Sequence, residues 1–134
     1  MSMSMSKTIR QSATFKATPH QVYEALMDSR QHTQFTGDEA KISRKVGGEI
    51  MAGSGYISGS NLELVPDRKI VQAWHASDWP EGHMSTATFS LAPVSAGTRL
   101  TFTHSGVPEE HYEEIKQGWI DFYWAPLKEY LEKK

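Results

Sequence analysis

Polar and apolar residues alternate near the start of the chain. Between residues 8 and 16, every second side chain from Ile9 to Phe15 falls on one face, and the intervening residues from Arg10 to Lys16 are polar. This period of two is typical of a strand with one buried side. Residues 1–7 begin with a repeat of Met and Ser that has no periodic partner, and we expect a disordered tail there. A single folded domain is then expected over residues 8–134.

Two short helices are predicted after this strand. Residues Thr18–Gln21 read Thr-Pro-His-Gln, which places a capping box at the start of a helix and proline at its first position. Asp28 or Ser29 can cap a second helix, which Gly37 would end.

The middle of the chain consists of short alternating runs separated by glycine and proline turns. In the last two runs, every second residue from Ala87 to Leu91 and from Leu100 to His104 is expected on one face. Because the connections are short, the runs predict an antiparallel meander. The predicted strands begin near Ala40, Glu49, Tyr56, Lys69, Met84 and Thr98.

One long helix is predicted from about Pro108 to Leu131. Its apolar residues at helical spacing cover nearly half of the circumference, whereas packing on a sheet needs only a face of about 100°. Pro126 lies inside the helix and should kink it, because proline removes one backbone hydrogen bond. The order of elements predicts an α+β helix-grip fold, in which a curved antiparallel sheet surrounds the C-terminal helix and two short helices close one end.

Composition narrows the class of protein. A net charge of −2 gives no basic footprint for nucleic acid or for anionic lipid. The absence of cysteine excludes disulfides, thiolate nucleophiles and cysteine-ligated zinc. No apolar run approaches the roughly 20 residues that span a bilayer, and no signal peptide is apparent. We therefore expect a cytoplasmic protein without membrane insertion.

The aromatic side chains of the sheet and helix are candidates for the lining of an apolar cavity. The alternative is that the same rings simply fill a close-packed core. His104 is expected to point inward beside them, as a polar contact for a ligand. The candidate ligand-binding residues are Trp74, Phe89, Phe102, His104, Trp119, Phe122 and Tyr123.

His104 is also the candidate for catalysis, since a buried imidazole can act as a general base. No second group is placed by the sequence to orient it, and a hydrogen-bonded core histidine is the alternative. The histidines lack the spacing of an HExxH motif, so no metal or other cofactor is implied.

Two tryptophans are candidates for contact with a protein partner. Trp79 lies on a predicted turn and Trp124 on the edge of the helix, and a partly exposed tryptophan often anchors an interface. Alternatively, Trp79 folds back over the mouth of the cavity. A basic run at residues 41–45 and an acidic run at residues 109–114 could meet the same partner.

Several segments resemble the C-terminal domain of the activator of heat-shock protein 90 (Hsp90) ATPase. They occur in the same order as in that family and extend across nearly the whole chain. The matching segments are Leu64–Pro66, Ile70–Trp74, Ser77–His83, Gly106–Pro108 and Gln117–Trp119.

The resemblance implies a START-like domain of the SRPBCC superfamily, whose members mostly bind apolar ligands between sheet and helix. It therefore favours a non-enzymatic domain that binds a small hydrophobic molecule. The first alternative is a co-chaperone-like module that contacts an Hsp90 chaperone. A second alternative is an enzyme of the cyclase or dehydratase type that uses His104.

Overall fold

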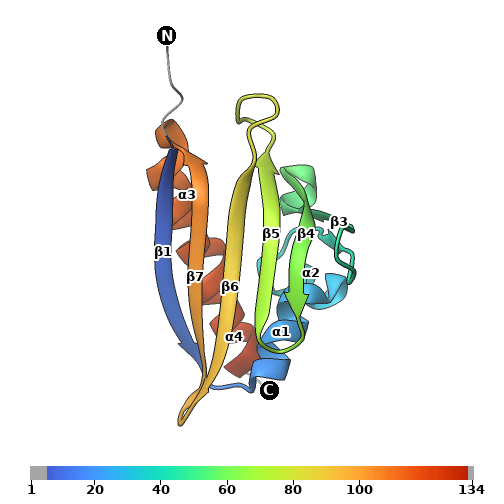
Figure 1. Cartoon of the computed structure of the whole chain (residues 1–134). Coiled ribbons are helices and arrows are strands. Elements are labelled where there is room, and N and C mark those ends of the chain that lie inside the picture. The colour runs from blue at the N-terminus through green and yellow to red at the C-terminus, as the bar shows by residue number, and fades with distance from the viewer. Residues whose placement is uncertain (1–5, 133–134) are drawn as a thin grey trace.

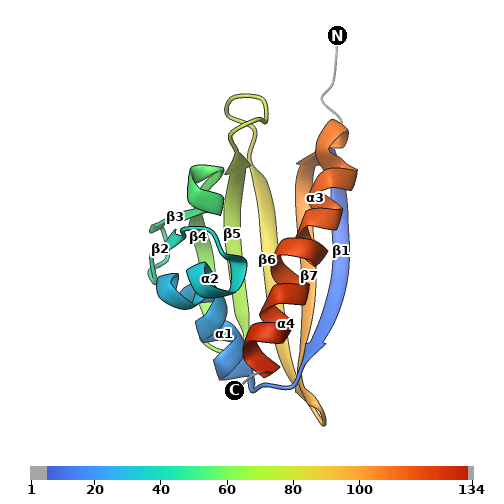
Figure 2. The ribbon, with the colours of Figure 1, turned by 180° about the vertical axis from the view of Figure 1, so that it is seen from behind.

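The computed structural model describes residues 6–132, which form one antiparallel sheet covered on one face by helices (Figures 1 and 2). Seven strands of this part of the chain pair in the order β1-β7-β6-β5-β4-β3-β2. Strands β2 to β7 therefore form the predicted meander, and β1 joins its last strand. The strands are β1 (Ser6–Phe15), β2 (Lys41–Ile42), β3 (Glu49–Ala52), β4 (Ile57–Val65), β5 (Lys69–Ala76), β6 (Ser85–Val94) and β7 (Gly97–Pro108).

The two short helices, α1 (Pro19–Met27) and α2 (Ser29–Thr36), have the predicted caps. The Thr18 hydroxyl accepts from the N–H of Gln21 at 3.1 Å, and the Gln21 side chain accepts from the N–H of Thr18 at 2.9 Å. Asp28 caps α2, and Gly37 ends it with a φ of 80°. That left-handed conformation is one that glycine adopts without steric cost.

The C-terminal helix runs along the inner face of the sheet, over β6, β7 and β1 (Figure 2). It comprises a short turn η2 (Glu109–His111), α3 (Tyr112–Trp119), a π-helical turn η3 (Ile120–Trp124) and α4 (Ala125–Glu132). Within the described part of the chain, every helix is too short or too polar to span a bilayer.

A π turn lies directly before Pro126, where a kink was predicted. The N–H of Ala125 donates to the carbonyl of Ile120, five residues earlier, instead of four. Proline at position 126 cannot donate to Phe122, and its ring would crowd that carbonyl in a regular helix. The wider turn aligns residues five apart, so Trp119 and Trp124 stack with ring centres 5.5 Å apart.

Two predicted boundaries are wrong. Strand β1 begins at Ser6, so two residues of the expected tail pair with β7, and residues 1–5 lie outside the described residues. Pro108 is the last residue of β7 and does not belong to the first turn of the helix, which begins as a regular α-helix at Tyr112.

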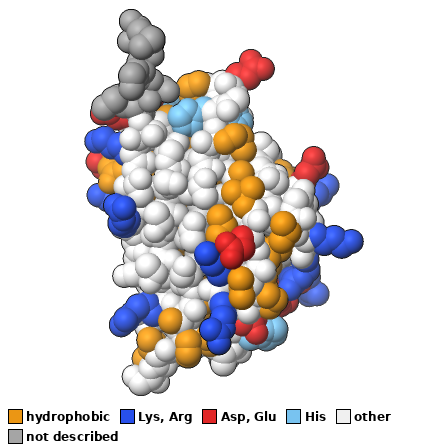
Figure 3. All heavy atoms as spheres, in the orientation of Figure 1, with side chains coloured by type: hydrophobic (Ala, Val, Ile, Leu, Met, Phe, Trp, Pro, Cys, Tyr) orange, Lys and Arg blue, Asp and Glu red, His pale blue; other side chains and the backbone are white. Residues whose placement is uncertain are grey.

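The core lies between the inner face of the sheet and the helices. The predicted alternation is confirmed on β6 and β7, where Phe89 pairs with Phe102 and Leu91 with Leu100, and all four side chains are buried. The outer face is largely uncharged and polar, with scattered hydrophobic side chains, a basic and an acidic side chain side by side near its centre, and further Lys and Arg towards its edges (Figure 3). This asymmetry is what a sheet with one solvated face requires.

Candidate ligand pocket between sheet and helix

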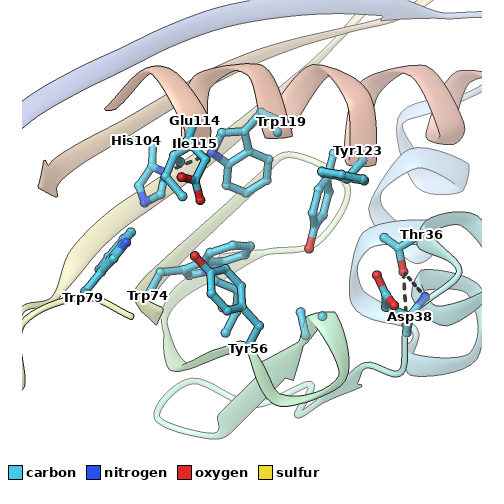
Figure 4. A pocket seen from close by; sticks show the side chains of 15 residues that line it. Thr36, Asp38, Tyr56, Trp74, Trp79, His104, Glu114, Ile115, Trp119 and Tyr123 are labelled. Carbon is cyan, nitrogen blue, oxygen red and sulfur yellow. Dashed lines mark hydrogen bonds between the residues drawn. The ribbon is translucent and has the colours of Figure 1, made fainter. Parts of the chain in front are cut away.

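A cavity of about 350 Å³ opens between the sheet, the C-terminal helix and the segment after α2 (Figure 4). Ligand pockets of proteins occupy about 300–1,000 Å³, so this volume suits a small molecule. Trp74 contributes a wall from β5, and Trp119 and Tyr123 contribute one from the helix. Tyr56 and Ile57 close the side formed by the start of β4.

Most of the predicted ligand-binding residues lie at this cavity. Trp74, His104, Trp119, Phe122 and Tyr123 all line it. Of these, Phe122 lies at the edge of the cavity with 63% of its surface exposed. The π turn explains this placement, because it directs Tyr123 and Trp124 inward together and leaves Phe122 facing outward.

Phe89 and Phe102 were expected in the cavity wall, and the structure places them elsewhere. They pair across β6 and β7 and pack on each other with ring centres 5.0 Å apart. Trp119 covers Phe102 with a centroid distance of 4.3 Å, so the tryptophan separates it from the cavity. For these two rings, the alternative of a filled core is correct.

The exposure predicted for Trp79 and Trp124 is also wrong. Trp124 is buried and donates a hydrogen bond of 2.6 Å to the side-chain oxygen of Gln11 on β1. Trp79 is buried edge-on between the rings of His75 and His83 and lines the cavity, in line with the alternative that it folds back over the mouth. Neither indole is therefore presented to a protein partner on the surface.

A chain of hydrogen bonds holds His104 and defines its protonated nitrogen. The indole N–H of Trp119 donates to Nδ1 at 3.0 Å, so Nδ1 carries no proton. The proton is on Nε2, which donates to the Ser85 hydroxyl at 2.7 Å, and that hydroxyl donates to the carbonyl of Trp74 at 3.1 Å. Figure 4 shows His104 and Trp119 joined at the end of the cavity nearest Trp79.

This network leaves His104 without the means to act as a general base. Burial lowers its pKa to about 3, so the imidazole is neutral at physiological pH. Its one basic lone pair is occupied by the Trp119 N–H. The geometry therefore gives His104 the role of orienting Trp119 and Ser85.

A second chain of hydrogen bonds fixes Tyr123. Nδ1 of His32 donates to the carbonyl of Leu26 at 3.0 Å, which leaves Nε2 to accept from the Tyr123 hydroxyl at 2.8 Å. Burial lowers the pKa of His32, although the bond to Leu26 opposes this change. Burial also raises the pKa of Tyr123, and the nearby charge of Asp38 adds to the effect. Both groups are therefore neutral, and they tie the C-terminal helix to α2.

A third chain fixes Trp74 from the sheet. Its indole N–H donates to the side-chain oxygen of Gln72 at 2.9 Å, and the Gln72 amide donates to Asn61 at 3.1 Å. The amide of Asn61 in turn donates to the carbonyls of Ser43 and Lys45. The three principal rings of the cavity are therefore held in place by hydrogen bonds at their polar atoms.

Few polar groups of the cavity remain free. Among the described residues, the buried side-chain nitrogens without a hydrogen-bond partner are Nε1 of Trp79 and Nδ1 of His111. Of these two residues, only Trp79 lines the cavity. The charged lining residues are Asp38 and Glu114, both acidic and both exposed.

One group of side chains near the mouth has the composition of a metal site. Ligand atoms of Asp78, His111 and Glu114 all lie within 4.8 Å of one another. Asp78 also accepts a hydrogen bond of 2.7 Å from the Tyr56 hydroxyl. Sequence reasoning missed this group, because its members come from the turn after β5 and from the start of the C-terminal helix, with no motif spacing.

Other cavity residues also escaped the sequence. Tyr56, Asp38 and Gly118 line the cavity, and they belong to the start of β4, the segment after α2 and the helix. Only Gly118 could have been found from the sequence, since a glycine inside a predicted helix often marks a place where the helix packs closely or borders a site. A Cβ at Gly118 would meet nothing closer than the Phe122 ring at 3.7 Å.

The meander closed by β1, the helix along its inner face and the cavity between them define a START-like domain of the helix-grip class. The chain belongs to the family described as "Activator of Hsp90 ATPase homolog 1-like protein", whose model matches residues 16–132. The resemblance seen in the sequence is thereby confirmed.

Individual relatives agree with this membership. The chain is 30% identical over 116 residues to the human "Activator of 90 kDa heat shock protein ATPase homolog 1", and the match covers 87% of this chain and 34% of the human protein. It therefore spans about a third of that relative. A solved structure titled as an HSP90 activator from Plasmodium falciparum superposes with a TM-score of 0.84 at 28% identity, over 96% of both chains. A protein of Chromobacterium violaceum superposes with a TM-score of 0.74 at 28% identity, over 93% of this chain and 95% of that one.

Proposed function

We propose that this domain binds a small, mostly apolar molecule in the cavity between its sheet and its C-terminal helix, without transforming it. The observation that carries the proposal is the fixed placement of Trp74, Trp119 and Tyr123 around about 350 Å³ of space. Each ring is oriented by its own hydrogen bond, to Gln72, His104 and His32 respectively. Rings held in this way keep the cavity preformed, which lowers the entropic cost of binding.

The chemistry of the walls limits the ligand. Burial of apolar ligand surface against the rings contributes about 25 cal/mol per Å². The N–H of Trp79 has no partner within the described residues and would favour a ligand with one hydrogen-bond acceptor. His104 contributes no reactive lone pair, so this proposal is for binding and not for catalysis.

A variant that fills the cavity tests the proposal. Gly118→Leu should place a side chain into the cavity, and its Cβ meets no close obstacle. Leucine also has a better helix propensity than glycine, so the variant should fold. The matched control is Gln117→Leu, which adds the same side chain at the preceding exposed residue.

Tryptophan fluorescence and melting temperature would report the binding of naphthylmethanol, a neutral aromatic probe. We expect the wild-type chain and Gln117→Leu to bind it and Gly118→Leu to bind it at least about tenfold more weakly, as expected when about 1.4 kcal/mol is lost. Equal binding by Gly118→Leu would refute the proposal, and so would a failure of the wild-type chain to bind either this probe or a charged probe with the same ring.

Contact with an Hsp90 chaperone is a second candidate function. It is supported by the names of two similar proteins, the human relative and the Plasmodium structure. The match to the Plasmodium structure covers almost the whole of this chain. Because Trp79 and Trp124 are buried, the charged segments at residues 41–45 and 109–114 are the better candidates for this contact.

Calorimetry with a purified Hsp90 would test this candidate directly. The charge reversals Lys41→Glu and Lys45→Glu alter exposed side chains and should weaken such a complex. Lys128→Glu, on an exposed position of α4, serves as the matched control. Absence of binding by the unmodified chain would exclude this contact.

A further inference from the structure

The cavity combines aromatic walls with acidic groups, and this combination selects for the charge of its ligand. We propose that the preferred ligand carries a positive charge, above all an ammonium group, attached to an apolar or aromatic body. This inference rests on the proposed binding function of the same cavity.

The aromatic rings provide the first part of the argument. Trp119 lies 4.8 Å from Trp74 and 4.6 Å from Tyr123 between ring centres, and Trp74 and Tyr123 are 6.2 Å apart. The three planes are mutually tilted by 39° to 59°, so they form a corner and not a flat stack. Because the face of an aromatic ring is electron-rich, such a corner attracts an alkylammonium group that comes within about 6 Å of a ring centre.

The charges at the mouth provide the second part. Among the lining residues, only Asp38 and Glu114 are charged, and no lysine or arginine is among them. None of the ion pairs found within residues 6–132 involves either carboxylate. Figure 4 shows Asp38 and Glu114 on opposite sides of the space between the rings. A cation entering the cavity therefore passes between two negative groups.

The hydrogen-bond donors provide the third part, because they leave little for an anion. The N–H groups of Trp74 and Trp119 and the hydroxyl of Tyr123 donate within the protein. The hydroxyl of Tyr56 donates to Asp78, a further acidic residue beside the mouth. An anionic head group could accept a hydrogen bond from the N–H of Trp79, but the carboxylates of Asp38 and Glu114 would repel it. A fatty acid is accordingly a poor ligand.

Three probes with the same aromatic ring separate the effect of charge from that of shape. The probes are the cation naphthylmethyl-trimethylammonium, the neutral alcohol naphthylmethanol and the anion naphthoate. Calorimetry can measure the affinity of the chain for each of them. We expect the cation to bind about tenfold more tightly than the alcohol, from cation–π attraction and the two carboxylates, and naphthoate to bind most weakly. Gly118→Leu should abolish the binding of the cation as well, which locates it in the cavity.

The double variant Asp38→Asn/Glu114→Gln tests the role of the carboxylates with side chains of nearly the same size. Its affinity for the cation should fall several-fold, while its affinity for the alcohol stays within about twofold. Glu113→Gln, one position along the same helix and outside the cavity, is the control and should behave as the wild-type chain.

The outcomes separate this inference from the binding function itself. If the alcohol or naphthoate binds as tightly as the cation, the inference is wrong and the proposed binding function stands. The inference is also wrong if the double variant keeps the same preference for the cation, or if Gly118→Leu binds the cation as tightly as the wild-type chain does. If none of the three probes binds the wild-type chain, the proposed function fails, and the inference fails with it.

Discussion

The indole N–H of Trp119 on the C-terminal helix donates a hydrogen bond of 3.0 Å to Nδ1 of His104 on β7. This contact joins the two layers of the fold at the cavity wall. It fixes the tautomer of the histidine and the orientation of the tryptophan together. An apolar replacement of either side chain would leave a buried polar atom of the other without this partner.

Loss of His104 should therefore destabilise the fold. In His104→Leu the Trp119 N–H lacks an acceptor, and the expected cost is about 2–3 kcal/mol in the free energy of unfolding. Urea denaturation would measure it. The control is His20→Leu. The His20 side chain is 65% exposed and hydrogen-bonded to Asp67, and its loss should cost less than about 1 kcal/mol. Equal stability of the two variants would contradict this role of His104.

Stability should also depend on pH through the buried histidines. The pKa of His104 is lowered to about 3 by burial, and that of His32 is lowered in the same direction. Between this value and the ordinary pKa of about 6.5, the unfolded chain binds protons that the folded chain does not. The stabilisation is therefore complete above that ordinary pKa and decreases as the pH falls towards about 3.

Free energies of unfolding from urea denaturation at several pH values between about 5 and 6.5 would show this dependence, to which His104 should contribute about 1 kcal/mol per pH unit. In His104→Leu, the free energy of unfolding should depend less steeply on pH, because the contribution of His104 is lost. An unchanged slope would show that His104 does not take part.

Truncation of Phe122 and truncation of Phe102 should change the free energy of unfolding by very different amounts, although the sequence assigned both rings to one cavity. Phe122→Ala removes a ring with 63% of its surface exposed and should change stability by no more than about 0.5 kcal/mol. Phe102→Ala empties a fully buried site and should cost about 3–5 kcal/mol. Denaturation curves would compare them, and a large loss in Phe122→Ala would show that this ring belongs to the core. Under the proposed function, Phe122→Ala should still weaken the binding of naphthylmethanol.

Tyr123→Phe should loosen the C-terminal helix from α2. The variant keeps the ring but removes the hydroxyl that donates to His32 at 2.8 Å. Nε2 of His32 would then be buried without a donor, at an expected cost of about 1–2 kcal/mol. Urea denaturation measures the loss. Tyr130→Phe, on a partly exposed position of α4, is the comparison and should cost less.

Local elements of this fold could be predicted because their causes lie within a few residues. The capping box joins Thr18 and Gln21, which are only three residues apart, and the alternation of β1 requires only its own period of two. The bounds of β5, Lys69–Ala76, follow from the turns on both sides of it. In each case the interactions that define the element are those between near neighbours in the chain.

The cavity could be predicted only in part. The inward side of Trp74 and His104 follows from strand alternation, and the inward side of Trp119 and Tyr123 follows from helical spacing. Phe122 lines the cavity as predicted, but its high exposure was not foreseen, since the spacing assumed a regular helix and the structure has a π turn at residues 120–124. Phe89 and Phe102 were placed wrongly because alternation gives the face of a sheet and not the position along the covering helix.

By itself, the sequence determined the order of the elements, the caps of the two short helices, the buried faces of the first strand and of the last two strands, and the family, since these depend on local patterns and on ordered segments of chain. The tertiary structure decided which rings surround a cavity and which fill the core, and it brought Asp38 and Glu114 to one mouth. It also decided the tautomer of His104 and the pairing of His32 with Tyr123, because these partners are 15 and 91 residues away along the chain. Contacts of this kind depend on strand register and helix docking, which are collective properties of the whole packed molecule.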